Sequence, residues 1–258
     1  ATGRLDGIEM IRKNPFNHSE YYRYLNCGYR LPLVGGTDKM SSDVPVGLYR
    51  TYARIGEDEF TYDNWCKAVA SGRTILSGGP IMHLSVDGHD IGDTLKLSGA
   101  GTVELEAWTE SILPINTLQI IQEGKVIASV ESKEGTRRLE IKEKIRIDSN
   151  TWIGARCGGP EYDGLVHYDS WERGVFAHTS PIYISVGGEW EMYNEDTFQY
   201  MLTMIEGDLA YIRESSGQHT HGMVTHHHGE DDHIAYLERP FIEARDAINT
   251  RMARLGLV

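Results

Sequence analysis

Eight short apolar segments between residues 73 and 186, separated by turn-forming residues, constrain the fold more than any other feature of the sequence. In one of them Val103, Leu105 and Ala107 alternate with acidic residues, as in a strand with one buried face. Short strands at this spacing favour an antiparallel β-sandwich, and Asp87-Gly88 and Glu123-Gly124 are predicted hairpin turns. The segments are 73–76, 81–86, 102–107, 117–122, 125–130, 138–141, 151–156 and 182–186.

The chain before this region has the pattern of a single β-α-β piece. Residues 5–11 and 31–34 are predicted strands, and residues 18–26 between them are a predicted helix. Such a piece is too small to close a barrel, since a complete β/α barrel repeats the unit about eight times. A further short helix is predicted over residues 63–72, with Asp63 as its N-cap and Gly72 as its stop.

Two amphipathic helices are predicted from Asn194 onward. Pro240 should kink the second helix or mark its true start, and Gly256 closes it. The helices are expected to form an antiparallel hairpin that packs on itself, on the rest of the chain or on a second copy, so a homo-oligomer is expected. The apolar positions recur about every 3.6 residues and are Phe198, Met201, Leu202, Ile205, Leu209 and Ile212, then Ile234, Leu237, Phe241, Ala244, Ile248, Met252 and Leu255.

These patterns together predict an α+β protein with three domains. They are a β/α domain over residues 1–56, a β-sandwich over residues 57–190 and a helical hairpin over residues 191–258.

The composition excludes several partners. The 258 residues carry a formal net charge of −13, which disfavours binding to nucleic acid or to an anionic membrane surface. No stretch reaches the ~20 apolar residues of a bilayer span, and the start does not resemble a signal peptide. A cytoplasmic protein is expected if the chain is complete as given. Cys27, Cys66 and Cys157 are predicted to be free core thiols.

Chemistry is first expected at Gly35-Gly36-Thr37-Asp38, which directly follows the predicted strand 31–34. Carboxylates at the carboxyl ends of strands in β/α folds gather metals and ligands, and glycines let backbone approach them closely. An ordinary Gly/Asp turn, with the Asp38 side chain bonding its own backbone, is the alternative.

The stretches LNCGYRLPLVGGTDKM and VGLYRTYARI resemble the last metal-binding segment of PHP-type metallohydrolases of the carbaryl-hydrolase-like CehA/McbA family. The resemblance implies that Asp38 is a metal ligand and that Glu9 matches a strand-borne glutamate. Met40 stands where the family often has a histidine, and the family's HxH pair has no counterpart before Asp38. SGRTILSGGPIMHLSVDG and FAHTSPIYISV resemble the family's accessory sandwich. The first region is therefore predicted to be a fragment of a PHP-type barrel that lacks the N-terminal metal-binding motifs.

A histidine-rich stretch between the two predicted helices is the other candidate metal site. Imidazoles beside carboxylates suit zinc or manganese, and the spacing of His219 and His221 puts both rings on one side of an extended segment. The candidate ligands are His219, His221, His226 and His228. A solvated loop with adventitious metal affinity is the alternative.

The first functional hypothesis is a metal-dependent hydrolase that uses metal-activated water on a small-molecule phosphoric or carbamic ester, the substrate class being implied only by the resemblance. Asp38 would be a metal ligand, Glu9 a second ligand or a base, and Arg50 an anion clamp. The alternative for Arg50 is an ion pair with one of the many carboxylates of the chain. The alternatives are a catalytically silent protein for assembly or ligand binding, and a metal-free esterase that uses Cys27 or His18.

Two other histidines are assigned to structure. His178 is predicted to hydrogen-bond locally at a strand end, with a catalytic role as the alternative, and His83 to lie on the outer face of its strand.

Overall fold

The computed structural model describes residues 1–9, 18–159, 174–216, 229 and 232–257. These residues form two compact units. One comprises Leu5–Met192, and the other combines Ala1–Arg4 with Tyr193–Val258. Residues 5–56 and 57–190, which are predicted to belong to separate domains, thus lie within one unit, whereas residues 1–4 group with the helices. None of the described helices is long and apolar enough to cross a membrane.

The larger unit begins with the predicted β-α-β piece. Strand β1 (Ile8–Glu9) pairs in parallel with β2 (Leu33–Val34), and helix α1 (Ser19–Asn26) connects them. β2 is shorter than the predicted strand 31–34, and β1 begins later than the predicted strand 5–11, because the ladder among the described residues has two residue pairs. In the described part of the chain this piece stands alone, and no β/α barrel is formed.

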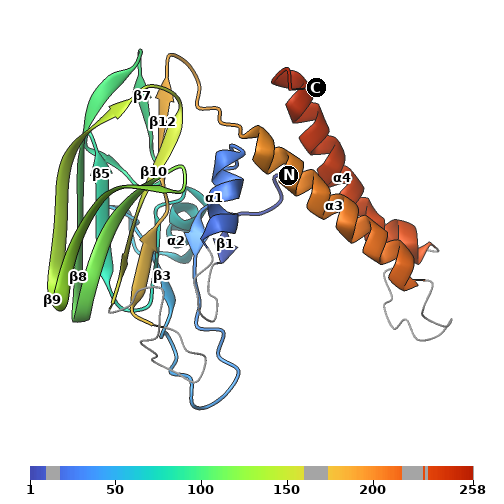
Figure 1. The fold of residues 1–258 in the computed structure, drawn as a ribbon. Coiled ribbons are helices and arrows are strands. Elements are labelled where there is room, and N and C mark those ends of the chain that lie inside the picture. The colour runs from blue at the N-terminus through green and yellow to red at the C-terminus, as the bar shows by residue number, and fades with distance from the viewer. Residues whose placement is uncertain (10–17, 160–173, 217–228, 230–231, 258) are drawn as a thin grey trace. The chain divides into compact units, whose positions relative to one another are not determined.

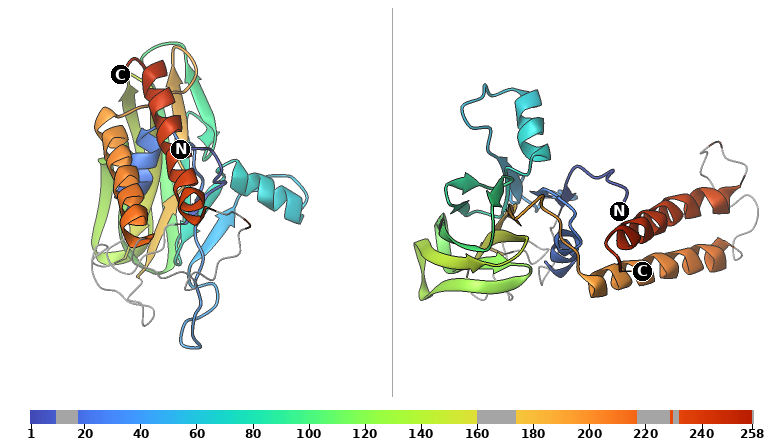
Figure 2. Two further views of the ribbon diagram at one scale, coloured as in Figure 1. Left: turned by 90° about the vertical axis from the view of Figure 1, so that its right-hand side faces the viewer. Right: turned by 90° about the horizontal axis from the view of Figure 1, so that it is seen from above.

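The remaining strands form one curled, mostly antiparallel sheet with the character of a sandwich (Figures 1 and 2). The strand order is β3-β4-β11-β10-β8-β5-β6, with β9 paired to β8, and with β12 lying between β10 and β7. The strands are β3 (Arg50–Ala53), β4 (Thr74–Ser77), β5 (Ile81–Val86), β6 (His89–Asp90), β7 (Thr94–Leu97), β8 (Gly101–Gln122), β9 (Lys125–Ile147), β10 (Thr151–Gly158), β11 (Phe176–Thr179) and β12 (Ile182–Val186).

The long β8–β9 hairpin replaces four of the predicted strands. Segments 102–107 and 117–122 are parts of β8, and segments 125–130 and 138–141 are parts of β9. The first half of β8 pairs with β5 and its second half with β10, so one bent strand belongs to both layers of the sandwich. The predicted turn at Glu123-Gly124 joins the hairpin, and the predicted turn at Asp87-Gly88 joins β5 to β6; all four residues have positive φ.

Part of the sheet is buried on both faces, which explains its continuous apolar runs. Ile75, Ile120 and Ile153 face the core between the layers, whereas their neighbours Leu76, Ile121 and Trp152 face a second, aromatic-rich core. Helix α1 covers that second face with three buried residues, Tyr21, Tyr22 and Leu25. Adjacent strand residues point to opposite faces, so each strand serves both cores.

Helix α2 (Tyr62–Ala70) corresponds to the predicted helix over 63–72, but its N-cap is Thr61 and not Asp63. The Thr61 side chain accepts a hydrogen bond from the Asn64 backbone N–H at 3.2 Å, and Asp63 lies inside the first turn. Gly72 follows the helix with a φ of 78°, as its predicted role as a stop requires. Cys27 and Cys157 are buried, as predicted, and Cys66 is half-buried.

The smaller unit contains the predicted helical hairpin, made of α3 (Glu195–Ser216) and α4 (His233–Arg254). Arg213 pairs with Glu238 at 2.6 Å and Arg245 with Glu206 at 3.1 Å, a register that requires antiparallel helices. Asp232 caps α4 by accepting from the Ala235 N–H, so Pro240 lies inside the helix and does not mark its start.

Candidate functional site

The carboxyl ends of β1 and β2 bring two of the predicted site residues to one edge. Glu9 ends β1, and the loop Gly35-Gly36-Thr37-Asp38 leaves β2 at the same end, because the two strands are parallel. If Gly36 carried a Cβ, it would lie 3.1 Å from Glu9 Oε1. The Glu9 carboxylate therefore lies directly against the loop that leads to Asp38, and glycine at position 36 makes room for it.

Asp38 has an unusual backbone conformation for a residue other than glycine, with a φ of 48°. Aspartate and asparagine tolerate this left-handed region better than other side chains. Asp38 and Glu9 are both exposed, and Met40, two residues beyond Asp38, has 76% of its surface accessible.

The sandwich holds β2 and this loop through side chains of several strands. Ser180 Oγ accepts from the Leu33 N–H at 2.8 Å, and Thr74 Oγ1 donates to the Leu33 carbonyl at 2.7 Å. Thr51 Oγ1 both accepts from the Gly35 N–H and donates to the Gly35 carbonyl, each at 2.8 Å. The loop is thus tied to the sheet on either side of the glycine pair.

Thr37 also fixes the loop, through its own side chain. Its Oγ1 donates to the Tyr49 carbonyl at 3.0 Å, and Tyr49 is fully buried in the aromatic core. The residue immediately before Asp38 is therefore anchored to the core of the unit.

Arg50 does not lie with these two carboxylates. Its strand neighbour Thr51 faces Gly35, and successive residues of a strand point to opposite faces. Consistently, the Arg50 guanidinium lies over the ring of Tyr52, 5.8 Å from its centroid, and Arg50 lines a separate groove with Ile112 and Arg137.

The predicted histidine ligands His219, His221, His226 and His228 lie outside the described residues. Within the described ranges, the structure contains no group of three or more His, Cys, Asp or Glu side chains arranged to hold a metal ion. Glu9 and Asp38 carry carboxylates, the ligand type that a hard divalent ion prefers, and they lie at the same edge of the β1–β2 pair.

The buried polar network around His178 was not predicted as a network. His178 Nδ1 lies 2.7 Å from the Thr179 carbonyl and must donate to it, so Nε2 accepts from the Tyr22 hydroxyl at 2.8 Å. The Tyr22 oxygen in turn accepts from Arg156 Nη1 at 3.4 Å. Burial lowers the pKa of His178 to about 3 and raises the pKa of Tyr22 to about 12.

This network holds α1 onto β10 and β11, and it supports the structural role predicted for His178. His18 stacks on Phe176 with ring centroids 5.1 Å apart, and burial lowers its pKa well below the usual value. His18 and Cys27 are both buried, which leaves neither placed to meet a substrate as an esterase would need. His83, predicted to be exposed, is half-buried because it stacks on Trp108 at 5.5 Å.

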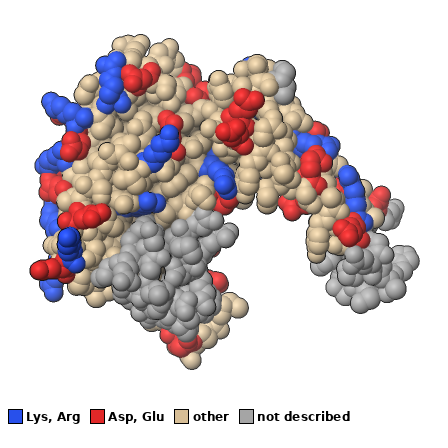
Figure 3. All heavy atoms as spheres, in the orientation of Figure 1, with Lys and Arg blue, Asp and Glu red and all other residues tan. Residues whose placement is uncertain are grey.

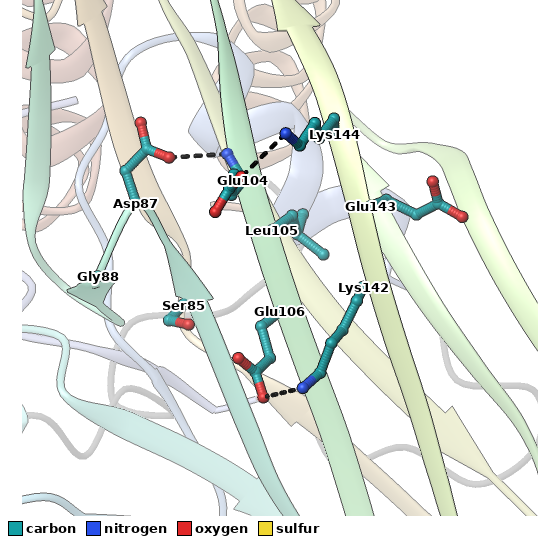
Figure 4. A pocket seen from close by; sticks show the side chains of 9 residues that line it. All are labelled: Ser85, Asp87, Gly88, Glu104, Leu105, Glu106, Lys142, Glu143 and Lys144. Atoms are coloured by element: carbon teal, nitrogen blue, oxygen red, sulfur yellow. Dashed lines mark hydrogen bonds and ion pairs between the residues drawn. The ribbon is translucent and has the colours of Figure 1, made fainter.

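A hollow on the outer face of β5, β8 and β9 is lined mostly by charged residues (Figure 4). Glu104 pairs with Lys144 at 3.1 Å and Glu106 with Lys142 at 3.2 Å, while Glu143 points away from both lysines. Charges of both signs are interspersed along this side of the molecule (Figure 3). The paired side chains make this a solvated face with cross-strand ion pairs, which also protect β9 from pairing with another sheet.

Comparisons with known proteins give no family. No family model matches the chain, and no curated protein matches it. Among solved structures, the sulfur carrier protein SoxY from Chlorobium limicola is 12% identical with a TM-score of 0.28, and the match covers 41% of this chain and 77% of SoxY.

Two further matches have the same character. The CARDB domain of PF1109 from Pyrococcus furiosus is 14% identical with a TM-score of 0.26, covering 42% of this chain and 89% of that domain. A lytic polysaccharide monooxygenase from Jonesia denitrificans is 11% identical with a TM-score of 0.23, and the match covers 36% of this chain and 57% of the monooxygenase chain. At these TM-scores the likeness carries no argument about the function of this chain.

Proposed function

We propose that this chain is part of a metal-dependent hydrolase, in which Glu9 and Asp38 contribute carboxylate ligands to a divalent ion at the carboxyl end of β1 and β2. The observation that carries the proposal is the position of the Glu9 carboxylate, whose Oε1 lies 3.1 Å from where a Cβ on Gly36 would be, so that one acidic side chain lies beside the loop that presents the other. The resemblance of the loop to the terminal segment of PHP-type metallohydrolases supports zinc or manganese as the metal, and phosphoric or carbamic esters as the substrate class.

A bound ion would lower the pKa of its water and polarise the ester. The residues of this chain would do three things around it. Asp38 would bind the ion, Glu9 would bind it or take the proton of the attacking water, and Thr37 and Thr51 would keep the loop in place through their bonds to Tyr49 and Gly35. Two carboxylates hold a divalent ion weakly, so the site needs further ligands from outside this pair.

Metal content and hydrolysis measured together test the proposal. Protein treated with a chelator and reconstituted with Zn²⁺ or Mn²⁺ is assayed on aryl phosphate esters and an aryl carbamate, alongside Glu9→Gln and Asp38→Asn. Both changes keep the side-chain size, and asparagine tolerates the φ of Asp38. Each should lower metal retention and activity, whereas Glu57→Gln, at an exposed position in the same unit, should leave both unchanged.

A His219→Ala/His221→Ala double variant shows whether the histidine-rich stretch contributes ligands. Activity that survives complete metal removal would refute the proposal, and unchanged metal content in Glu9→Gln and Asp38→Asn would refute the assignment of these ligands.

The second candidate is a catalytically silent protein for assembly or ligand binding. It is favoured because the described part of the chain contains no group of three or more side chains that could hold a metal ion. A folded protein that retains no metal and turns over none of these esters would support this candidate.

A further inference from the structure

A groove lies where the pairing of β8 with β9 breaks. Glu110 pairs with Arg138 and Ile115 with Thr136, so residues 111–114 of β8 stand opposite the single residue Arg137 of β9. An irregularity of this kind re-aims side chains and ends regular pairing. It turns Ile112 outward, with 85% of its surface exposed, and it lets both Arg137 and Arg138 line the same hollow.

Two glycines of the three-residue turn between β4 and β5, Gly78 and Gly79, line the groove. Gly79 has a φ of 137°, a conformation that other residues rarely adopt, and its N–H bonds to Ser77 Oγ at 2.9 Å. The hollow has a volume of about 610 Å³. This lies within the ~300–1,000 Å³ of typical small-molecule sites.

Apolar side chains form much of the wall. Ile81 is 49% exposed and Leu113 is 36% exposed, and both line the groove together with Leu48 and Ile112. Exposed aliphatic side chains gathered around one hollow are a feature of binding surfaces, whereas isolated ones are common on any protein.

The charges in the groove are positive and incompletely balanced. Arg138 bonds to Glu110 and lies 3.5 Å from Glu140. Arg50 and Arg137 also line the groove, and within the described residues neither forms an ion pair with a carboxylate. By contrast Arg73 and Arg146 have carboxylates at 3.6 Å and 2.8 Å. Arg50 and Arg137 are thus two guanidinium groups without a carboxylate partner among the described residues, in a chain whose net charge is −13.

We infer that this groove binds an organic anion with an apolar body. Arg50 and Arg137 bind the carboxylate or phosphate group of the ligand, because guanidinium groups match the geometry of both. Ile81, Ile112 and Leu113 cover the apolar part. The site is separate from Glu9 and Asp38, since Thr51 and not Arg50 faces their loop, and it stands whether or not the proposed hydrolase function holds.

Binding of decanoate, measured by isothermal titration calorimetry, tests this inference, with the uncharged decanol as the matched probe. The full chain should bind decanoate saturably. Arg50→Gln/Arg137→Gln should weaken decanoate binding at least tenfold and leave decanol binding unchanged, while Ile112→Ser should weaken both. The control Arg146→Gln, which removes a guanidinium paired with Asp148, should change neither.

All the substituted side chains are exposed, so the variants are expected to fold, and circular dichroism verifies this. Equal decanoate affinity in the wild type and in Arg50→Gln/Arg137→Gln would overturn the inference, as would the absence of saturable decanoate binding to the wild type. Metal content measured on the same variants separates this result from the hydrolase proposal, because the groove contains neither Glu9 nor Asp38.

Discussion

Gly36 is the residue on which the proposed metal edge depends most directly. Gly36→Ala places a Cβ 3.1 Å from Glu9 Oε1, closer than ordinary contact, and the Glu9 carboxylate must move. The backbone of Gly36 does not have positive φ, so alanine adds no backbone strain and the free energy of unfolding should change little. We expect metal affinity to fall by about 10- to 100-fold, the usual effect of disturbing a residue beside a metal.

Gly188→Ala is the matched control for Gly36→Ala, since the backbone at Gly188 has no positive φ and an added Cβ there meets open space. Titration of the apo proteins with Mn²⁺ or Zn²⁺ measures the effect. Equal affinity in both variants would mean that the position of Glu9 does not matter to the metal.

His178 should make the protein less stable in mild acid. Its pKa is about 3 in the folded state, against about 6.5 when unfolded, so the unfolded state binds more protons between these values. The stability contributed by the neutral ring is therefore complete above pH 6.5 and is lost as the pH falls toward 3. At about 1.4 kcal/mol per pKa unit, His178 should lower the free energy of unfolding by about 2 kcal/mol from pH 7 to pH 5, and buried His18, whose pKa is also lowered, should add to this fall.

Urea unfolding at the two pH values measures this loss. His178→Asn removes the titrating ring, so it should reduce the dependence on pH even if it lowers stability overall. His89→Asn, which changes a partly exposed histidine, should retain the wild-type dependence. If His178→Asn keeps the full dependence, other groups cause it.

At the scale of residues, the sequence could predict where a side chain lies relative to its own strand better than which distant side chains it contacts. Asp38 was assigned by its place after a predicted strand and Glu9 by the family resemblance, and the parallel pairing of β1 with β2 puts both residues at the same strand ends. Arg50 was assigned by nearness in sequence, but strand alternation directs it away from Gly35. The bond between Tyr22 and His178 joins residues 156 positions apart, and no local pattern indicates such a pair.

At the scale of elements, the sequence predicted turns reliably and strand lengths poorly. Asp87-Gly88 and Glu123-Gly124 form the expected two-residue turns because the backbone there requires positive φ. Strands β8 and β9 were each predicted as two pieces, because Pro114 and the charged residues around Gly135 interrupt the alternation. Both strands nevertheless continue, because β8 and β9 pair on either side of the register shift between Glu110 and Ile115.

The β8–β9 turn should be sensitive to loss of its glycine. Gly124 has a φ of 88°, where an L-residue costs about 1–2 kcal/mol, and a Cβ there would lie 3.4 Å from the Tyr22 ring. We expect Gly124→Ala to lower the free energy of unfolding by about that amount. Gly99→Ala, with open space and no positive φ, should change it by less than about 0.5 kcal/mol. Equal urea midpoints for the two variants would contradict the claim that alanine at position 124 strains the backbone.

At the scale of the whole molecule, the chain has two cores in the larger unit and a smaller set of buried apolar residues in the helical unit. The sandwich core and the aromatic core share the strands between them, so they should unfold together. The buried apolar residues of the helices are Phe198, Leu209, Ile248 and Met252. With so few, the helical unit should be the less stable of the two, since helices of this length depend on tertiary packing.

Separate unfolding of the units is the prediction that follows. Leu209 is fully buried in α3, and Leu209→Ala should cost about 2–5 kcal/mol of the helical unit's stability. In thermal scans the helical circular dichroism signal should then be lost at a lower temperature, while the tryptophan fluorescence transition stays unchanged, because Trp152 lies in the aromatic core. Ile153→Ala, a matched change in the sandwich core, should move the fluorescence transition and leave the helical one in place. If both variants shift both signals equally, the two units unfold as one cooperative structure, and the helices depend on the sandwich for their stability.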